Sequence, residues 1–65
     1  MRVAIRKTST PFQPVLAVVL EGITPDGVVP IQTLHNFAAW DLSKARDFAR
    51  LQAGVRGVEL HDATL

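Results

Sequence analysis

Few residues in this chain could perform acid-base or metal chemistry, and their spacing gives them little support. The candidates are two histidines and three carboxylates, namely His35, His61, Asp41, Glu59 and Asp62. His61 and Asp62 are adjacent, so in a strand they point to opposite faces. No pair of candidates has the i, i+4 helical separation that zinc enzymes use. The sequence therefore predicts no metal, no cofactor and no catalytic residue, and we expect the chain not to be an enzyme.

Hydroxyl side chains in the first third of the chain do not form a nucleophile motif either. A catalytic serine needs a sharp strand-to-helix turn or a glycine-rich surrounding, and the hydroxyl residues here lack both. They lie in a proline-containing segment, at Thr8, Ser9 and Thr10. We interpret this segment as an extended loop.

Arginines offer a second kind of chemistry, which is contact with phosphate. Arg46 and Arg50 are one helical turn apart, with Arg56 beyond them, and could form a stripe that binds nucleic acid. Asp47 can offset this charge, so a solvated helix face is the favoured interpretation. Arg2 and Arg6 could extend the basic surface, or could protect a sheet edge from unwanted pairing. The candidate nucleic-acid residues are Arg2, Arg6, Arg46, Arg50 and Arg56.

Three aromatic residues fall outside the regular elements that we expect. Phe37 and Trp40 precede the predicted helix, where an apolar residue often packs back onto the core. Phe12 lies between two prolines, and a rigid loop that presents an aromatic side chain is typical of a protein-interface anchor. We therefore predict that Phe12 contacts a partner.

Hydrophobic patterning predicts four strands and one helix. These elements must position the residues described above. Alternation places Val3 and Ile5 on one side of the first strand. Asp41 is a good N-cap and Gly54 a good exit residue for an amphipathic helix, and a connector containing His35, Asn36, Phe37 and Trp40 precedes it. The expected elements are strands at 2–7, 15–23, 28–34 and 58–60 and a helix at 42–53.

The segment Thr24-Pro25-Asp26-Gly27 predicts a tight turn, and Pro30 selects the register of the hairpin around it. Proline has no N–H, so it fits only where that group would point away from the neighbouring strand. This favours Ile23 opposite Val28, with a four-residue loop. One face of the hairpin then carries Leu16, Val18, Leu20, Val29 and Ile31, and the other carries Val15, Ala17, Val19, Glu21, Ile23, Val28, Pro30 and Gln32.

The run Val15-Leu16-Ala17-Val18-Val19-Leu20 is apolar at every position. A strand with one buried face needs an apolar residue only at every second position, so this run indicates burial on both faces. One helix covers one face. We expect a second copy of the chain or another protein to cover the other, through partner-binding residues Phe12, Val15, Ala17 and Val19.

Length and composition limit the remaining possibilities. At 65 residues without cysteine, the chain is a single small domain, 1–65, for which oligomerisation is the remaining source of extra stability. A net charge of +1 does not by itself indicate nucleic acid, and no apolar stretch approaches the roughly 20 residues that span a bilayer. No signal peptide is evident, so we expect a soluble, cytoplasmic protein without a membrane partner.

The sequence thus predicts an α+β fold, a small β-β-β-α-β domain with a mainly antiparallel sheet and one amphipathic helix on one face. We expect a non-enzymatic protein-interaction module that acts as a homodimer, such as an adaptor, an assembly factor or an inhibitor of a larger protein. By analogy alone, such chains also occur as regulatory or phage-type accessory proteins. The alternatives are a nucleic-acid-binding module and, more weakly, an enzyme subunit whose site another chain completes.

Overall fold

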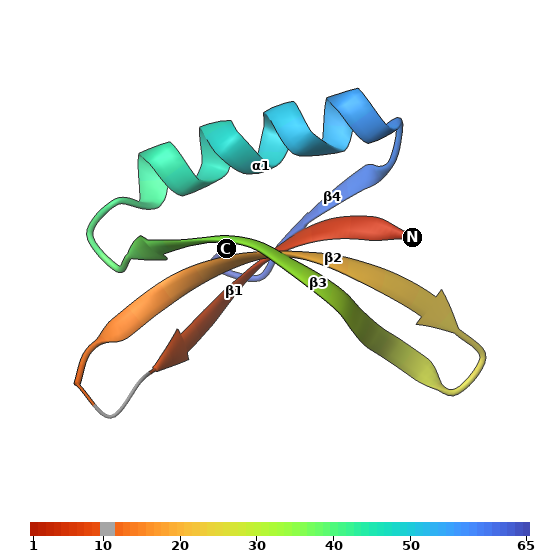
Figure 1. Ribbon diagram of the computed structural model, residues 1–65, viewed down its shortest axis with the longest axis horizontal. Helices are drawn as coiled ribbons and strands as arrows, with labels where there is room; N and C mark the ends of the chain where they lie inside the picture. The colour runs from red at the N-terminus through yellow and green to blue at the C-terminus, as the bar shows by residue number, and fades with distance from the viewer. Residues whose placement is uncertain (10–11) are drawn as a thin grey trace.

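A computed structural model describes residues 1–9 and 12–65, and it confirms the α+β fold with the order β-β-β-α-β. The sheet has the strand order β3-β2-β1-β4, in which β1 pairs with β2 and β2 with β3 in antiparallel fashion, while β4 runs parallel to β1. The helix covers one face of this sheet (Figure 1). The elements are β1 (Arg2–Ser9), β2 (Pro14–Thr24), β3 (Gly27–Ala38), α1 (Leu42–Arg56) and β4 (Glu59–Asp62).

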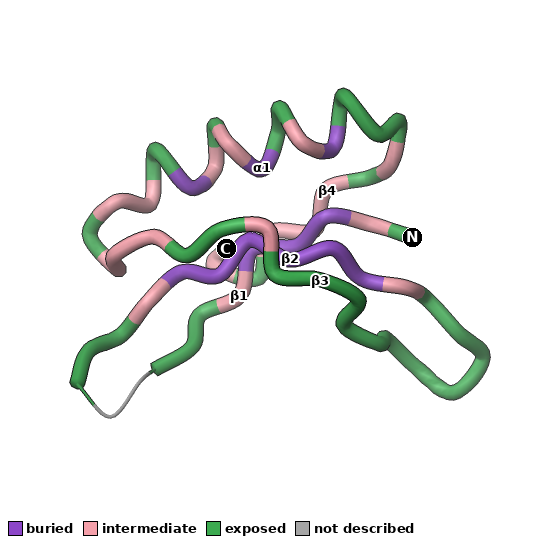
Figure 2. The backbone as a smooth tube through the Cα atoms, in the orientation of Figure 1, coloured by how far each residue is buried: buried purple, intermediate pink, exposed green. Residues whose placement is uncertain are grey.

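The hydrophobic core lies between the helix and the two central strands (Figure 2). Large side chains come from the strands, where Val3, Ile5 and Val18 are fully buried, as the alternation on β1 predicts. The helix contributes three alanines four residues apart, Ala45, Ala49 and Ala53. Because alanine is small, the helix backbone can lie close to the sheet, and the branched strand residues fill the space between the layers.

The β2–β3 hairpin has the predicted register, with Ile23 opposite Val28. Pairing continues by one residue to Thr24 and Gly27, so the loop has two residues and not four. Gly27 has a φ of 135°, a region that side chains other than glycine rarely adopt. The turn therefore depends on glycine at this position.

The expected connector after the third strand is wrong in part, because β3 continues through His35, Asn36 and Phe37. Two register shifts explain the difference, since the chain accommodates one extra residue at Ile31 and another at Leu34. Each bulge reverses the alternation of side chains, so the strand does not show a continuous period of two in the sequence. For the same reason Gln32 lies opposite Leu20, on the helix side of the sheet. The predicted position of Gln32 on the opposite face is wrong.

The helix ends later than predicted, at Arg56, and Gly57 is its C-cap. Gly57 has a φ of 66°, its N–H donates to the Gly54 carbonyl at 3.2 Å, and the N–H of Val58 donates to the Ala53 carbonyl at 3.0 Å. These two bonds form a Schellman motif. Gly54 lies inside the helix, where one glycine costs only about 1 kcal/mol relative to alanine. Asp41 occupies the predicted N-cap position, but its side chain makes no capping hydrogen bond.

Candidate interaction surface

The sheet face opposite α1, which we call the open face, was expected to need a partner to cover its apolar residues. Ala4, Ala17 and Val19 form a small cluster there and are 0%, 8% and 8% exposed in a single chain. Both ends of the sheet bend away from the helix (Figure 1). Ala17 is in register with Arg6 and Val19 with Thr33, so longer or polar side chains flank this cluster on the same face. Ala17 and Val19 therefore offer little of their own surface, and their contact with a partner stays a prediction.

A cluster of three charged side chains lies beside these residues on the open face. Glu21 accepts hydrogen bonds from Arg2 and Arg6, with 3.0 Å from each Nε to a carboxylate oxygen and 3.1 Å from Arg6 Nη2 to Oε1. The exposed fractions are 6% for the Glu21 side chain, 15% for Arg2 and 38% for Arg6. Burial raises the pKa of Glu21, but the hydrogen bonds and charges of Arg6 and Arg2 outweigh it and hold the pKa below its ordinary value.

A second ion pair joins the helix to the last strand. Arg46 Nε lies 2.8 Å from Asp62 Oδ2, and Arg46 Nη2 donates to the Thr64 hydroxyl at 3.0 Å. Asp62 also accepts hydrogen bonds from the backbone N–H and the hydroxyl of Thr64. Burial raises the pKa of Asp62, but the hydrogen bonds from Thr64 and Arg46 and the charge of Arg46 outweigh it and hold the pKa below its ordinary value. Arg46 was expected on the exposed helix face, but it reaches over the side of the helix to β4.

The predicted arginine stripe is divided between two surfaces. Arg2 and Arg6 lie on the open face of β1, and β4 pairs with β1 only from Arg2 to Ile5, so a role in protecting a sheet edge is wrong for Arg2 and stays a prediction for Arg6. Arg50 pairs with Asp47 at 3.3 Å and Arg56 donates to Gln52, both on the helix. Among the described residues, four of the five predicted arginines thus have a carboxylate partner, which reduces the charge available for phosphate.

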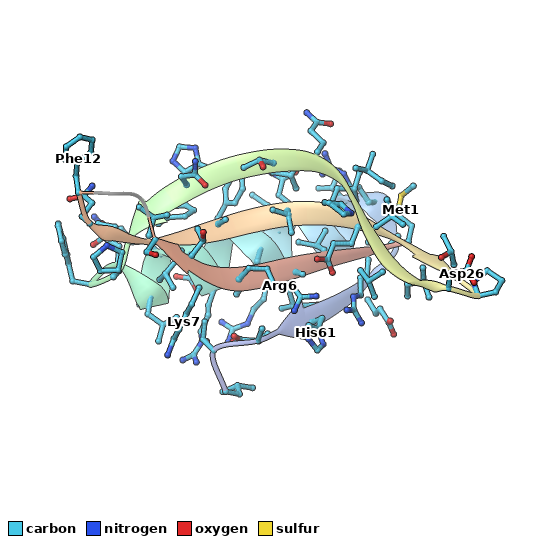
Figure 3. The ribbon with its side chains drawn as sticks, turned by 90° about the horizontal axis from the view of Figure 1, so that it is seen from below. Met1, Arg6, Lys7, Phe12, Asp26 and His61 are labelled. Atoms are coloured by element: carbon cyan, nitrogen blue, oxygen red, sulfur yellow. The ribbon has the colours of Figure 1, made fainter. Side chains whose placement is uncertain are left out.

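The residues considered for acid-base or metal chemistry are also dispersed. His35 packs against the rings of Phe37 and Phe48, with centroids 4.5 Å and 5.6 Å away, on the helix side of the sheet. His61 is in register with Ala4 and therefore lies on the open face, as Figure 3 shows from that side. Thr10 lies outside the described residues, and Thr8 and Ser9 end β1. Within residues 1–9 and 12–65, no three His, Asp or Glu side chains gather as a metal site, and no pocket is present.

Phe12 is 94% exposed at the β1–β2 end of the sheet, and Asp26 lies at the opposite end (Figure 3). The contact of Phe12 with a partner stays a prediction. Phe37 packs against the core cluster as expected, but Trp40 is 76% exposed and does not cap the core. Val15, the remaining predicted partner-binding residue, is half-buried opposite Ala38.

Sequence analysis missed an exposed apolar surface at the β2–β3 end of the sheet, which we call the hairpin patch. Its four residues are all branched aliphatics and are 41–54% exposed: Ile23, Val28, Val29 and Ile31. Val29 and Ile31 are on the predicted helix-side face, but this end of the sheet bends away from α1 (Figure 1). A signal was available, because a helix of 15 residues spans about 22 Å whereas the 11 residues of β2 span about 36 Å. The helix is too short to cover the hairpin.

In the described part of the chain, no helix has the length and apolar character needed to cross a membrane. No family model matches the chain, and neither a curated protein nor a solved structure matches it.

Proposed function

We propose that this chain is a non-enzymatic protein-interaction module, acting as an adaptor, an assembly factor or an inhibitor, and that it binds its partner through the hairpin patch. The observation that carries the proposal is the exposure of four branched aliphatic side chains on both sides of one short hairpin. Exposed apolar residues gathered at one end of a small protein are typical of a binding surface. Val29 and Ile31 also belong to β3, an edge strand that can add a further strand.

The energy available from the patch supports binding of modest strength. Full burial of a valine or isoleucine contributes about 1.5–3 kcal/mol, so covering four that are 41–54% exposed would contribute about 4 kcal/mol. Association costs at least about 4 kcal/mol in lost freedom of motion. Further contacts are therefore needed, and the free backbone edge of β3 can supply them as hydrogen bonds.

Phe12, Val15, Ala17 and Val19 belong to the same proposal as a second contact region. Phe12 supports it best, because an aromatic side chain that is 94% exposed can lose a large apolar area when a partner binds. Phe12 lies at the other end of the sheet from the hairpin patch (Figure 3). A partner that used both regions would have to extend along the whole sheet.

Affinity capture from native extract tests the proposal when three versions of the chain are compared. The double variant Val29→Lys/Ile31→Lys removes the exposed aliphatic surface of β3, and Leu51→Lys removes an apolar residue that is 62% exposed on the helix. We expect the wild type and Leu51→Lys to retain the same proteins, including further copies of this chain, and the double variant to lose them. Equal capture by all three versions would contradict the proposal.

The second candidate function is nucleic-acid binding through Arg46, Arg50 and Arg56 on α1. It is supported by the exposure of the Arg50 side chain, 65%, because the 3.3 Å contact with Asp47 is a surface pair worth at most about 1 kcal/mol and can open for a phosphate. Titration with mixed DNA and RNA at low salt tests it. Binding that weakens steeply as salt rises would support this candidate, and indifference to both nucleic acids would remove it.

We propose the cytoplasm as the place of action. The sequence contains no cysteine, so the chain does not depend on an oxidising compartment for disulfide bonds. Fractionation of cells that carry a tagged full-length chain would test it.

A further inference from the structure

We propose that Arg6 is a strap across the centre of the open face, and that its release from Glu21 makes this part of the sheet accessible. The inference rests on the proposed function, because Ala17 and Val19 of the second contact region lie at this centre. It assigns the regulation of that region to one side chain of the chain itself. While the strap is closed, the apolar atoms beneath it are kept from water.

The centre of the open face must be covered from above, although α1 lies on the other side of the sheet. Ala4 is 0% exposed and Val19 is 8% exposed. His61 lies beside Ala4 on β4, and Thr33 lies beside Val19 on β3. Neighbouring strands are about 4.8 Å apart, so residues beside a short side chain shield its flanks and not its tip. A methyl group without exposure therefore has other side-chain atoms above it.

The strand register places Arg6 in this position. Three pairs of residues follow one another on the open face of β1 and β2: Arg6 with Ala17, Ala4 with Val19, and Arg2 with Glu21. Arg6 nevertheless bonds to Glu21, with 3.0 Å from Nε to Oε2 and 3.1 Å from Nη2 to Oε1. Four residues along a strand span about 13 Å. The Arg6 side chain therefore extends along the sheet and crosses the middle pair, near the middle of the view in Figure 3.

Release of Arg6 would leave no buried charge without a counterion. Glu21 is 6% exposed, but it would keep Arg2, whose Nε lies 3.0 Å from Oε1. The Arg6 side chain is 38% exposed and would move into water, whereas Arg2 is only 15% exposed. A buried charge is costly only where it loses its partner. The cluster thus consists of a fixed pair, Arg2 with Glu21, and a third member that can leave.

Anions that compete with Glu21 for the guanidinium group would open the strap. Arg6 presents two parallel N–H groups to the carboxylate, a geometry that other carboxylates and oxyanions also fit. Dissolved salt weakens such a pair where water reaches it, and water reaches Arg6. The closed state is therefore expected at low ionic strength, and the fraction of open molecules should rise with salt.

Thiol reactivity can measure the strap, because the chain has no cysteine of its own. Val19→Cys places a slightly smaller side chain beneath the strap. Thr33→Cys is the control, since it lies level with Val19 on the same face but on β3, where it is exposed and outside the path of Arg6. Iodoacetamide is a neutral reagent, and its rates are extrapolated to the fully ionised thiol so that any effect of Arg6 on the thiol pKa is removed.

Two arginine variants are compared in both cysteine backgrounds. Arg6→Ala should raise the alkylation rate at Val19→Cys by about tenfold or more and leave the rate at Thr33→Cys unchanged, because only a local cover is lost. Arg2→Ala removes the same charge from the same carboxylate but leaves both bonds of Arg6, so it should change the rate at Val19→Cys far less. Sodium chloride at about 1 M should raise this rate when Arg6 is present and not in Arg6→Ala. Circular dichroism checks that all variants are folded.

Three results would overturn the strap. The first is an equal rate at Val19→Cys with and without Arg6. The second is an equal increase at Val19→Cys and Thr33→Cys, which would indicate a general loosening of the fold. The third is an increase that Arg2→Ala reproduces, because the loss of either arginine, and not the path of Arg6, would then be the cause.

These results are independent of the proposed function. Capture through the hairpin patch does not involve Arg6, so an absent strap would leave the loss of capture by Val29→Lys/Ile31→Lys as it is. A strap that opens as expected, with equal capture by all versions of the chain, would overturn the proposed function and leave the strap standing. If the strap opens but Arg6→Ala captures no more protein than the wild type, its control of the second contact region is overturned.

Discussion

Replacement of Glu21 by glutamine is expected to destabilise the fold more than a change that preserves the size of the side chain would suggest. The change keeps the size and shape of the side chain but removes the negative charge that Arg2 and Arg6 share. Glutamine can still accept through its single oxygen, while its amide N–H groups would face the N–H donors of an arginine. The two guanidinium groups then keep their charge without a counterion.

The magnitude follows from the exposure of the three side chains. A hydrogen bond to a charged group contributes about 1.5–3 kcal/mol, and three join this cluster, of which one or two would be lost. Arg6 is 38% exposed, so water compensates much of its loss, whereas Arg2 is only 15% exposed. We expect Glu21→Gln to reduce the free energy of unfolding by about 2 kcal/mol at neutral pH. For a domain of this size that corresponds to a decrease in Tm of about 8–16 °C.

The pH dependence gives the prediction a signature that a packing defect would lack. Folding lowers the pKa of Glu21 below its ordinary value of 4.5, so folding favours the ionised form. The stabilisation is complete at pH values above 4.5 and is lost as the pH falls through the lowered pKa of the folded state. When Glu21 is protonated it resembles glutamine. The difference between wild type and variant should therefore disappear in acid.

Thermal melts followed by circular dichroism, from pH 7 down to pH 2.5, measure this difference. Asp62 also has a lowered pKa, but it is present in both proteins and does not affect their difference. Glu59→Gln removes the same charge from an exposed position on β4 and should change the free energy of unfolding by less than about 0.5 kcal/mol. Equal Tm values for wild type and Glu21→Gln at pH 7, or a difference that persists unchanged in acid, would refute the reasoning.

Five further substitutions test the two faces, the helix end and the exposed loop. Val18→Asp should unfold the chain, because Val18 is 0% exposed beneath α1. Val19→Asp should destabilise it less, because Val19 is 8% exposed on a face that the helix does not cover; a larger loss of circular dichroism for Val19→Asp would mean that the faces are assigned wrongly. Gly57→Ala should lower the free energy of unfolding by about 1–2 kcal/mol, because the φ of 66° at this position strains an alanine. Gly54→Ala should raise it by up to about 1 kcal/mol, because the added methyl group meets open space and alanine favours a helix interior. Urea titrations would show these opposite signs. Phe12→Ala should cost under about 1 kcal/mol, against about 3–5 kcal/mol for a buried phenylalanine, and a melt that loses the larger amount would place Phe12 in the core.

Local sequence signals predict those parts of this fold that single residues determine. Pro30 was sufficient to select the pairing of Ile23 with Val28, because a missing N–H excludes the alternative register. Alternation on β1 was sufficient to place Val3 and Ile5 in the core. In these cases the physical cause lies in the residue itself or in its immediate neighbours.

Features that depend on the third dimension could not be predicted in this way. Next to the bulges at Ile31 and Leu34, polar residues occur in adjacent pairs, Gln32-Thr33 and His35-Asn36, which hides the alternation of a strand, so the predicted strand ends too early. Arg46 lies at the side of the helix, and only the return of β4 brings Asp62 to within 2.8 Å of it. An ion pair between residues 16 positions apart requires the topology to be known first.

The same limit explains why the expected partner-binding face and the exposed apolar surface differ. An apolar run from Val15 to Leu20 indicates burial on both faces, and from Leu16 to Leu20 both faces are indeed buried, since the residues there are 9% exposed or less. What the run does not indicate is that a 15-residue helix ends before the strands do. The apolar residues left without cover are therefore those at the end of the hairpin, where Val28, Val29 and Ile31 follow the turn. Uncovered aliphatic side chains on an uncharged edge strand supply both the area and the backbone groups for association, and for this reason we place the contact with a partner at β3.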